Sequence, residues 1–323
     1  MVRWCRGTGT SSCRSGSPAE RGPASFWEEQ DMQLGLIGLG RMGGNMRERL
    51  RAAGHEVVGY DRDPKVSDVA NLAELAEKLT APRAVWVMVP AAVTDATIDE
   101  LAGVLGEGDI IIDGGNSKFS DDGPRGERLA ERGIGYVDAG VSGGVWGRQN
   151  GYALMVGGSE EHVGRLMPIF EALKPEGEFG FVHAGPVGAG HYAKMVHNGI
   201  EYGLMQAYAE GFELLSKSEL VTNVPATIKS WREGSVVKSW LLDLLDRALD
   251  QDPGLTALRA YAEDTGEGRW TVDEAIRLAV PMNVIAGALF ARFASREVDS
   301  PALKAVAALR QQFGGHAVTP ADG

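Results

Sequence analysis

The chain has 323 residues, of which 44% are apolar and 24% are charged, so it is long enough for two domains and able to bury a proper core. Its formal net charge of −12 argues against a nucleic-acid-binding protein, because no basic stripe is available to neutralise phosphates. It contains no apolar run long enough for a transmembrane helix.

The first 31 residues are rich in Gly, Ser, Arg and Pro and show neither a helical nor a strand period. They also lack the apolar stretch of a secretory signal. We therefore expect residues 1–31 to be a disordered extension, with Met32 as the start of the functional protein. Both cysteines, Cys5 and Cys13, lie in this segment. Because no cysteine remains for a disulfide framework or a metal site, we expect a cytoplasmic protein.

Short apolar segments alternate with segments of helical period from residue 33 to residue 156. This alternation is typical of a parallel, doubly wound sheet of the Rossmann type. The segments predicted as strands are 33–37, 56–60, 84–89, 109–113, 136–139 and 153–156, and those predicted as helices are 41–53, 72–79 and one that ends near residue 105.

The strand pattern ends at about residue 181, and the remaining chain has a helical pattern. Residues 188–216 contain no proline and keep a helical spacing, which predicts one long helix that leaves the sheet. Residues 224–309 are also helical in pattern, with breaks expected at Pro253, Gly266, Gly268 and Pro281. The sequence thus predicts an α/β protein in which a Rossmann-type domain, residues 32–185, is followed by a smaller all-helical domain, residues 186–323.

A glycine motif, Gly38-Leu39-Gly40-Arg41-Met42-Gly43, follows the first predicted strand and opens the first predicted helix. In this context the first glycine permits a tight turn, the second lets a pyrophosphate approach the backbone, and the third lets helix and strand pack closely. The free amides at the helix N-terminus favour an anion. The motif therefore predicts a dinucleotide cofactor, and a glycine-rich turn without a ligand is the alternative.

Asp61 ends the second predicted strand and bears on the choice of cofactor. An acidic side chain at this position accepts hydrogen bonds from the ribose hydroxyls and repels a 2′-phosphate, which favours NAD over NADP. Arg62 keeps NADP possible, because a guanidinium can bind a 2′-phosphate. Besides the six motif residues, we expect the cofactor to contact Asp61, Arg62, Val89, Pro90 and Asn116.

A polar stripe lies on the long predicted helix and consists of Lys194, His197, Asn198, Glu201 and Tyr202. At about 100° per residue, these side chains fall within a sector of roughly 140° of the helix surface. Burying such groups is costly unless they pair or bind something, so the stripe is typical of the wall of a polar site. A solvated face with an ion pair is the alternative. The residues between them are apolar, as on a helix buried on its other faces, namely Met195, Val196 and Ile200.

Two glycine-rich loops are expected after predicted strands, where open sheets bind their ligands. Residues 113–117 carry Asn116. Residues 140–144 carry Ser142, Gly143 and Gly144, and backbone amides of such a loop can face an anionic group. Each loop can also be an ordinary turn.

Several single residues allow two interpretations. Arg292 and Arg310 can form an anion clamp or can be solvated surface charges. His191 can belong to the site or only pack near the start of the long helix, and Trp146 is expected in the core or at a rim. No group of histidines and carboxylates has metal-ligand spacing in the sequence, so we expect no required metal.

Taken together, the motifs resemble those of the 6-phosphogluconate dehydrogenase family. The block from Lys194 to Tyr202 is the most specific, because the wider β-hydroxyacid dehydrogenase group shares the lysine and the asparagine but not the glutamate-tyrosine end. The resemblance covers nearly all of residues 32–316. It is carried by GLGRMG from residue 38, DGGNS from 113, GVSGG from 140, GAGHYAKMVHNGIEYGLMQ from 188, GRWT from 268, FAR from 290 and RQQFGGH from 310.

The resemblance implies oxidative decarboxylation of 6-phospho-D-gluconate to D-ribulose 5-phosphate and CO2 with reduction of NAD or NADP, a step of the pentose phosphate pathway. It implies that Lys194 is the general base for the substrate 3-hydroxyl and that Glu201 is the general acid for carbon 1 of the product. The implied contacts to the carboxylate and hydroxyls are Asn116, Ser142, Gly143, Gly144, His197 and Asn198. Tyr202, Arg292 and Arg310 are implied to hold the phosphate, with Thr265 among the residues at the substrate, and His316 is implied to close the site.

The sequence departs from the longer family pattern in three respects. Long members read KGTGKW where this chain reads TGEGRW at residues 265–270, so Thr265 replaces a phosphate-contacting lysine and Glu267 replaces a threonine. Arg269 or Thr265 can compensate for the lysine. The helical domain is shorter, as in the short-chain branch of the family. Asp61 replaces the 2′-phosphate cradle of NADP-dependent members.

The resemblance also implies that the tail with Arg310 and His316 reaches into a neighbouring subunit, which predicts a homodimer or a homotetramer. A related β-hydroxyacid dehydrogenase acting on a smaller, non-phosphorylated acid without decarboxylation is an alternative function, which Thr265 favours. A non-catalytic dinucleotide sensor on the same fold is a third, opposed by the presence of both Lys194 and Glu201.

Overall fold

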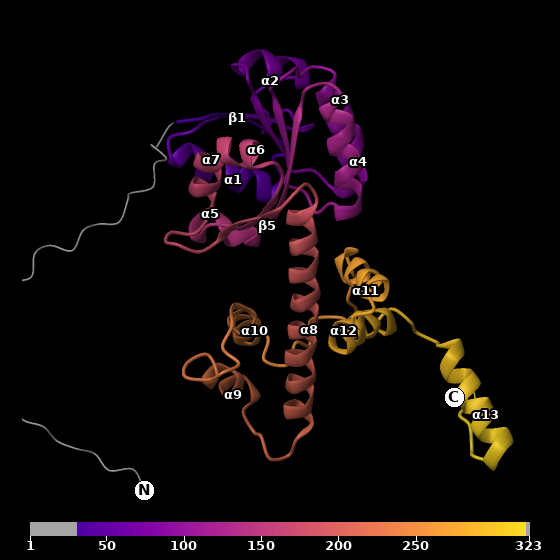
Figure 1. Cartoon of the computed structure of the whole chain (residues 1–323). Coiled ribbons are helices and arrows are strands. Elements are labelled where there is room, and N and C mark those ends of the chain that lie inside the picture. Colours follow the sequence, from indigo (N-terminus) through magenta and orange to yellow (C-terminus); the bar gives the residue numbers. More distant parts are fainter. Residues whose placement is uncertain (1–30, 321–323) are drawn as a thin grey trace, which may run out of the picture.

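The computed structural model describes residues 31–320, so the extension predicted for residues 1–31 lies outside the described residues except for its last position. The described chain forms a sheet domain, a long helix α8 (Ala189–Lys217) that leaves the sheet, and groups of shorter helices beside α8 (Figure 1). The predicted α/β class, a Rossmann-type sheet followed by a helical region, is confirmed. Within residues 31–320, no helix combines the length and the apolar character that crossing a membrane requires.

Seven strands form one sheet in the order β2-β1-β3-β4-β5-β6-β7. Strands β1 to β5 are parallel, so their carboxyl ends meet at one edge. The chain goes from β1 outward to β2 and returns to β3 on the other side of β1, and open sheets bind ligands at such a switch point. The strands are β1 (Gln33–Ile37), β2 (Glu56–Tyr60), β3 (Ala84–Val87), β4 (Ile110–Asp113), β5 (Gly135–Ser142), β6 (Ala153–Gly157) and β7 (Phe181–Gly185).

Two features of the sheet differ from the prediction. Strand β6 is antiparallel to β5, because the connection through η1 (Gly144–Trp146) and α5 (Gly147–Asn150) is shorter than a parallel crossover needs. The expectation that strands end at about residue 181 is wrong, since β7 pairs with β6 at the sheet edge. Residues of β7 are half-buried or exposed, so this strand lacks the continuous apolar run of a central strand.

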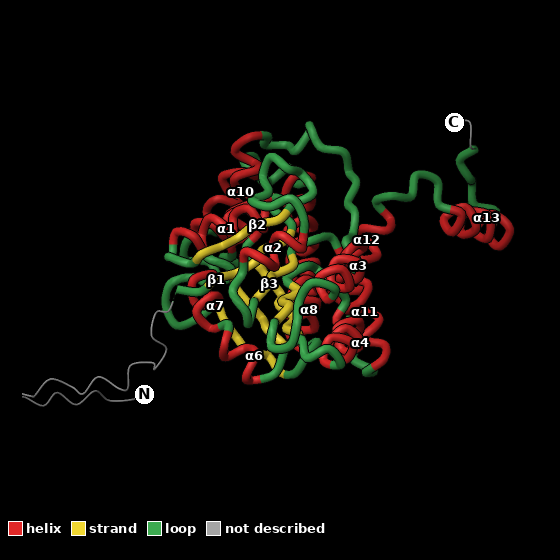
Figure 2. Tube along the Cα trace, turned by 90° about the horizontal axis from the view of Figure 1, so that it is seen from above, coloured by secondary structure: helices red, strands yellow, loops and turns green. Residues whose placement is uncertain are grey.

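Helices bury both faces of the sheet, and Figure 2 shows the strands between α1 and α7 on one side and α3 and α4 on the other. Successive strand residues face opposite sides: Trp86 belongs to one core cluster, whereas Val85 and Val87 belong to the other. The covering helices are α1 (Arg41–Ala52), α6 (Glu160–Arg165) and α7 (Met167–Leu173) for the first cluster, and α2 (Leu72–Lys78), α3 (Ala91–Ala102) and α4 (Phe119–Ala130) for the second.

The predicted long helix is confirmed as α8, which spans 29 residues. Asp138 of β5 accepts hydrogen bonds from the backbone N–H of Gly188 at 2.7 Å and of His191 at 2.8 Å. This carboxylate therefore caps the start of α8, where the helix dipole favours a negative charge. Gly190 packs so closely on β6 that a Cβ atom there would lie 2.4 Å from the backbone oxygen of Met155. The first turn of α8 is thus fixed against the sheet.

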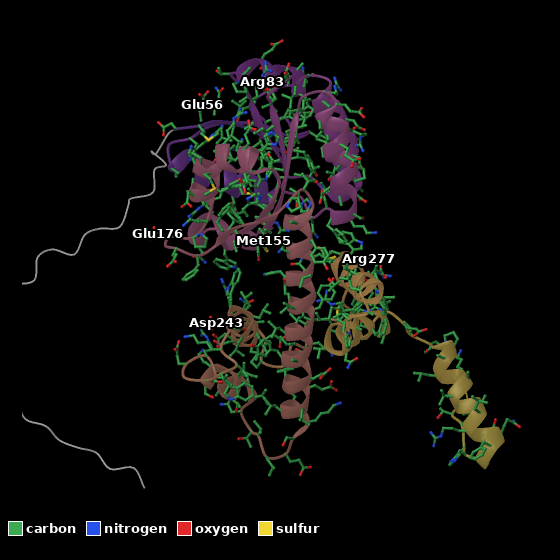
Figure 3. All side chains as sticks on the ribbon, in the orientation of Figure 1. Glu56, Arg83, Met155, Glu176, Asp243 and Arg277 are labelled. Carbon is green, nitrogen blue, oxygen red and sulfur yellow. The ribbon has the colours of Figure 1, made fainter. Side chains whose placement is uncertain are left out.

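The other helices lie beside α8. Helices α9 (Val224–Ser230) and α10 (Trp240–Gln251) occupy one side and α11 (Glu267–Arg277) and α12 (Asn283–Ala294) the other, as the labelled Asp243 and Arg277 show (Figure 3). The last helix, α13 (Pro301–Gly314), stands apart from the rest of the described chain and has no buried residue (Figures 1 and 2).

Three of the four predicted helix breaks, Pro253, Gly266 and Pro281, fall between helices. The break predicted at Gly268 is wrong, because this glycine lies inside α11. A Cβ atom at Gly268 would lie 2.5 Å from the ring of Tyr202, so glycine serves close packing of α11 on α8 at this position.

Candidate active site

A cavity of about 810 Å³, here called the α8 cavity, lies beside α8 at the carboxyl ends of β4 and β5. The stripe on α8 contributes four polar residues to its wall, and both predicted loop regions reach it. Ser142 was predicted to lie in a loop, but it is the last residue of β5. The predicted residues that line the α8 cavity are Asn116, Ser142, Gly143, Gly144, Lys194, His197, Asn198 and Glu201.

A second cavity of about 610 Å³, here called the β1 cavity, lies at the switch point between β1 and β3. Both cavities are lined by Met42, Met88, Gly115 and Asn116, so they meet at the loop after β4. Leu39 does not line the β1 cavity but is buried. The predicted residues that line it are Gly38, Gly40, Arg41, Met42, Gly43, Asp61, Arg62, Val89, Pro90 and Asn116.

The three motif glycines fit a dinucleotide pyrophosphate for three different reasons. Gly38 has φ +87°, and a Cβ atom there would lie 2.4 Å from the backbone oxygen of Met88. A Cβ atom at Gly43 would lie 1.9 Å from the oxygen of Gly38, whereas one at Gly40 would meet only open space. Helix α1 has no side-chain N-cap and no acidic residue in its first turn. Its first amides are therefore available to an anion beside Gly40.

Asp61 is held at the end of β2 by backbone hydrogen bonds. One carboxylate oxygen accepts from the N–H of Leu39 at 2.7 Å and the other from the N–H of Asp63 at 2.9 Å. Each oxygen keeps a further lone pair, so the carboxylate can also accept from ribose hydroxyls. Arg62 lines the same cavity, so the residues that favour NAD and those that permit NADP lie side by side.

Buried polar contacts fix the loop that carries Asn116. Asp113 accepts hydrogen bonds from the N–H of Gly115 at 3.0 Å and from the hydroxyl of Ser117 at 2.7 Å. The guanidinium of Arg125 lies 3.4 Å from the same carboxylate, which balances its charge. The residues on both sides of Asn116 are therefore held by a fully buried side chain.

His191 belongs to this buried network and lines neither cavity. Its Nδ1 lies 2.8 Å from Asp122, which also accepts from the hydroxyl of Tyr136 at 2.8 Å. Burial lowers the pKa of His191, but the hydrogen bond and charge of Asp122 outweigh burial and raise the pKa to about 9. Asp113, Asp122 and His191 place possible ligand atoms within 4.8 Å of one another, a grouping that sequence spacing did not reveal. Arg125 and Tyr136 already satisfy these carboxylates, so internal pairing accounts for the group.

Lys194 lies where α8 crosses β5, and a Cβ atom added at Gly140 would lie 2.4 Å from the Cβ atom of Lys194. Burial lowers the pKa of Lys194, and the charges of Glu201 and Glu267 partly offset that effect. A lysine with a lowered pKa can supply a neutral amine as a base. His197, one turn along, lies 3.3 Å from the Ser142 hydroxyl.

Tyr202, Thr265 and Arg292 form a second group that does not line the α8 cavity. The ring of Tyr202 is buried, and its hydroxyl accepts from the N–H of Thr265 at 3.3 Å. The guanidinium of Arg292 stacks on that ring at 3.4 Å from its centroid. Arg310 lies on α13, which stands apart from the other helices (Figure 1), and His316 follows α13; neither residue lines either cavity. One chain therefore does not bring the predicted phosphate residues into the cavity.

Several residues that line the α8 cavity were not predicted from the sequence. Helix α10 contributes Trp240, Leu241 and Leu244, an apolar stripe with no polar signal to mark it. Ile200 was expected on a buried face but is 52% exposed and lines the cavity. Trp146 lies at the cavity wall, under the guanidinium of an arginine of α10. Glu267 lies outside the cavity, and the sequence marked it only as a departure from the family pattern, without indicating that this acid is buried.

A dinucleotide turn at a sheet switch point, joined to a cavity with a lysine and a glutamate on one helix, defines a nicotinamide-dependent dehydrogenase with a helical second domain. The family model described as the NAD binding domain of 6-phosphogluconate dehydrogenase matches residues 33–177. The model described as the 6-phosphogluconate dehydrogenase C-terminal domain matches residues 190–318. The chain belongs to the 6-phosphogluconate dehydrogenase family, an oxidoreductase family, which confirms the resemblance seen in the sequence.

This chain is similar both to relatives of about its own length and to longer relatives. It is 41% identical to putative 6-phosphogluconate dehydrogenase YqeC of Bacillus subtilis over 88% of this chain and 99% of that protein. It is 40% identical to the NAD(+)-dependent, decarboxylating 6-phosphogluconate dehydrogenase of Haloferax volcanii over 90% of this chain and 100% of that protein. The Plasmodium falciparum 6-phosphogluconate dehydrogenase structure has a TM-score of 0.74 at 27% identity, covering 90% of this chain and 67% of that one.

Proposed function

We propose that this protein oxidises and decarboxylates 6-phospho-D-gluconate to D-ribulose 5-phosphate and CO2, with NAD or NADP as the oxidant. The observation that carries this proposal is the meeting of the two cavities at Asn116, with Lys194 and Glu201 on the wall of the α8 cavity. The similarity to the Haloferax volcanii protein, which is named for this reaction, supports the same substrate.

The motif from Gly38 to Gly43 would hold the cofactor pyrophosphate on the first amides of α1. A bound nicotinamide would accept a hydride from carbon 3 of the substrate. Asp61 would hold the ribose hydroxyls and oppose a 2′-phosphate, so we expect NAD to be preferred. Arg62 leaves NADP possible, since its guanidinium borders the same cavity.

Lys194 would act as the general base at the substrate 3-hydroxyl, taking its proton as the hydride leaves carbon 3. The lowered pKa of Lys194 favours the neutral amine that this step needs. The resulting 3-keto acid loses CO2 because its carbonyl can accept the electron pair of the bond between carbons 1 and 2. The ammonium of Lys194 would then donate a hydrogen bond to the carbonyl oxygen while negative charge develops on it.

Glu201 lies seven residues after Lys194 on the same helix and lines the same cavity. We propose that it protonates carbon 1 of the five-carbon enediol left by decarboxylation, which was carbon 2 of the substrate. Base and acid would then serve different carbons. Around them, polar side chains and backbone amides would hold the substrate carboxylate and hydroxyls. These residues are Asn116, Ser142, Gly143, Gly144, His197 and Asn198.

The phosphate end would be completed by a second copy of the chain. Tyr202 of α8 contacts Thr265 and Arg292 outside the α8 cavity. We propose that Arg310 and His316 of a neighbouring copy complete this group. Helix α13 supports this arrangement, because it leaves large apolar side chains exposed, as expected of a helix that packs on another chain. These side chains are Leu303, Val306, Leu309 and Phe313.

A related dehydrogenase of a smaller, non-phosphorylated β-hydroxyacid is the second candidate. It is favoured by the position of Arg292, which stacks on Tyr202 and does not line the cavity, and by Thr265 in place of a lysine. One assay separates the two functions: the protein is mixed with 6-phosphogluconate and NAD or NADP, and absorbance of the reduced nicotinamide is followed together with CO2 release. We expect both signals. Reduction of the nicotinamide without CO2, or activity only with smaller acids, would contradict the proposed function.

A further inference from the structure

Glu267 is a buried carboxylate that the proposed mechanism does not use. It is the first residue of α11 and only 2% exposed, and it does not line the α8 cavity. Its carboxylate accepts a hydrogen bond from the hydroxyl of Thr265 at 2.5 Å. A negative charge at the first turn of a helix is favoured by the helix dipole, which helps to retain the charge in a buried position.

The start of α11 packs directly on α8 beside Lys194. The hydroxyl of Thr271 lies 2.7 Å from the backbone oxygen of Glu267 and 3.0 Å from that of Met195, the residue after Lys194. The approach is close enough that a Cβ atom at Gly199 would lie 2.8 Å from the Thr271 side chain. One hydroxyl therefore bridges the backbone of the acid and the backbone next to the lysine. This contact places Glu267 on the flank of the polar stripe.

The other groups around Lys194 leave Glu267 as its permanent countercharge. On α8 itself, Glu201 and His197 line the same cavity, and α10 faces the cavity with apolar residues. Asp138 of β5 is engaged by the backbone N–H groups at the start of α8, and Asp122 of α4 is engaged by His191. On α12, Arg292 stacks on Tyr202. Glu201 is a proton donor in the proposed reaction, so its charge changes during the cycle, whereas Glu267 is buried and does not line the α8 cavity.

We propose that Glu267 is a positioning residue that acts through Lys194: its fixed negative charge stabilises the ammonium formed when Lys194 takes a proton, and it sets the pH at which this base is free. This inference rests on the proposed role of Lys194 as the base. The part of Glu267 resembles that of the buried aspartate that stabilises a charged histidine in hydrolase triads.

The test measures the protonation of Lys194 without relying on activity. Full-length protein is labelled with a limiting amount of an amine-reactive reagent from about pH 6 to about pH 11, and modification of Lys194 is quantified by peptide mass spectrometry. Glu267→Gln should move the labelling midpoint down by about one pH unit, a tenfold loss of proton affinity. Glu267→Asp, which keeps the charge, should restore most of the shift. If Glu267→Gln does not fold, Glu267→Met removes the same charge without a buried amide.

The control is Asp273→Asn, which removes a charge from an exposed position of the same helix and should leave the midpoint unchanged. An equal midpoint in Glu267→Gln and wild type, or an equal shift in the control, would overturn the inference. With 6-phosphogluconate, the acidic limb of the kcat/KM profile should shift in the same direction as the labelling midpoint. If the wild type does not turn over this substrate, the proposed function fails, yet the labelling result still decides the role of Glu267.

Discussion

Gly190→Ala should lower both the stability and the turnover of the protein, because it disrupts the close contact between α8 and the sheet. Gly190 lies in the first turn of α8, one turn before Lys194. A Cβ atom there would lie 2.4 Å from the backbone oxygen of Met155, 2.7 Å from that of Asp138 and 2.8 Å from the backbone nitrogen of Gly157. All three neighbours belong to hydrogen-bonded strands, so none can rotate away as a side chain would.

The magnitude follows from this geometry. Ordinary contact begins at 3.4 Å, so the helix must move away from β6 by about 1 Å. Overpacking of this kind costs about 1–3 kcal/mol, and the rigid backbone neighbours place the expected cost near the upper value. A shift of about 1 Å at Lys194 would misplace the proposed base relative to the substrate, which can lower turnover by about 100-fold.

The matched control is Gly211→Ala on the same helix, where an added Cβ atom meets nothing within 4 Å. This change should raise the free energy of unfolding by about 0.5–1 kcal/mol and leave kcat unchanged, because alanine favours a helix and no contact is strained. Both variants are compared with wild type by urea unfolding at one protein concentration, followed by circular dichroism, and by steady-state kinetics. A Gly190→Ala protein as stable and active as Gly211→Ala would refute the packing argument.

Three further predictions address the chemistry, the cofactor and the assembly. Lys194→Met should slow nicotinamide reduction by at least about 100-fold, with NAD binding retained in a fluorescence titration. Glu201→Gln should slow turnover without preventing formation of the ternary complex. Near-normal turnover of Lys194→Met would exclude Lys194 as the base. Asp61→Asn should raise the use of NADP relative to NAD in parallel kcat/KM measurements, and an unchanged ratio would count against its ribose role. Removal of residues 301–323 should yield a smaller species in sedimentation and raise the KM for 6-phosphogluconate, whereas a wild-type monomer with full activity would contradict assembly through the tail.

Much of the sheet domain follows from local sequence signals. Strands β1 and β2 begin and end at the predicted residues, because continuous apolar runs flanked by turn residues mark buried parallel strands. The glycine motif has a stereochemical reason at each position, so its three glycines predict the turn. The stripe on α8 is equally readable for four of its five residues, which line the α8 cavity, whereas Tyr202 contacts Thr265 and Arg292 outside it.

Long-range contacts account for what the sequence left open. The edge strand β7 is specified by its pairing with β6 more than by its own pattern. The contribution of α10 to the α8 cavity depends on how the chain folds back after α9, which no local signal encodes. The same applies to Arg292, whose side chain stacks on Tyr202, and to Asp122 and His191, which are 69 residues apart in the chain and meet in the buried network.

That buried network links the two walls on which the proposed chemistry depends. Asp113 holds the residues on both sides of Asn116, while Asp138 and Asp122 hold the first turn of α8 through the backbone and the ring of His191. Both walls are therefore fixed by charges inside the sheet domain, and Lys194 follows on a continuous helix whose first turns cannot slide on β6. Because removing one member would leave other buried charges unpaired, the network resists small displacements. In the proposed reaction, the distance between base and cofactor would thus be set within one chain, whereas the phosphate end would depend on α11, α12 and the tail of a neighbouring copy.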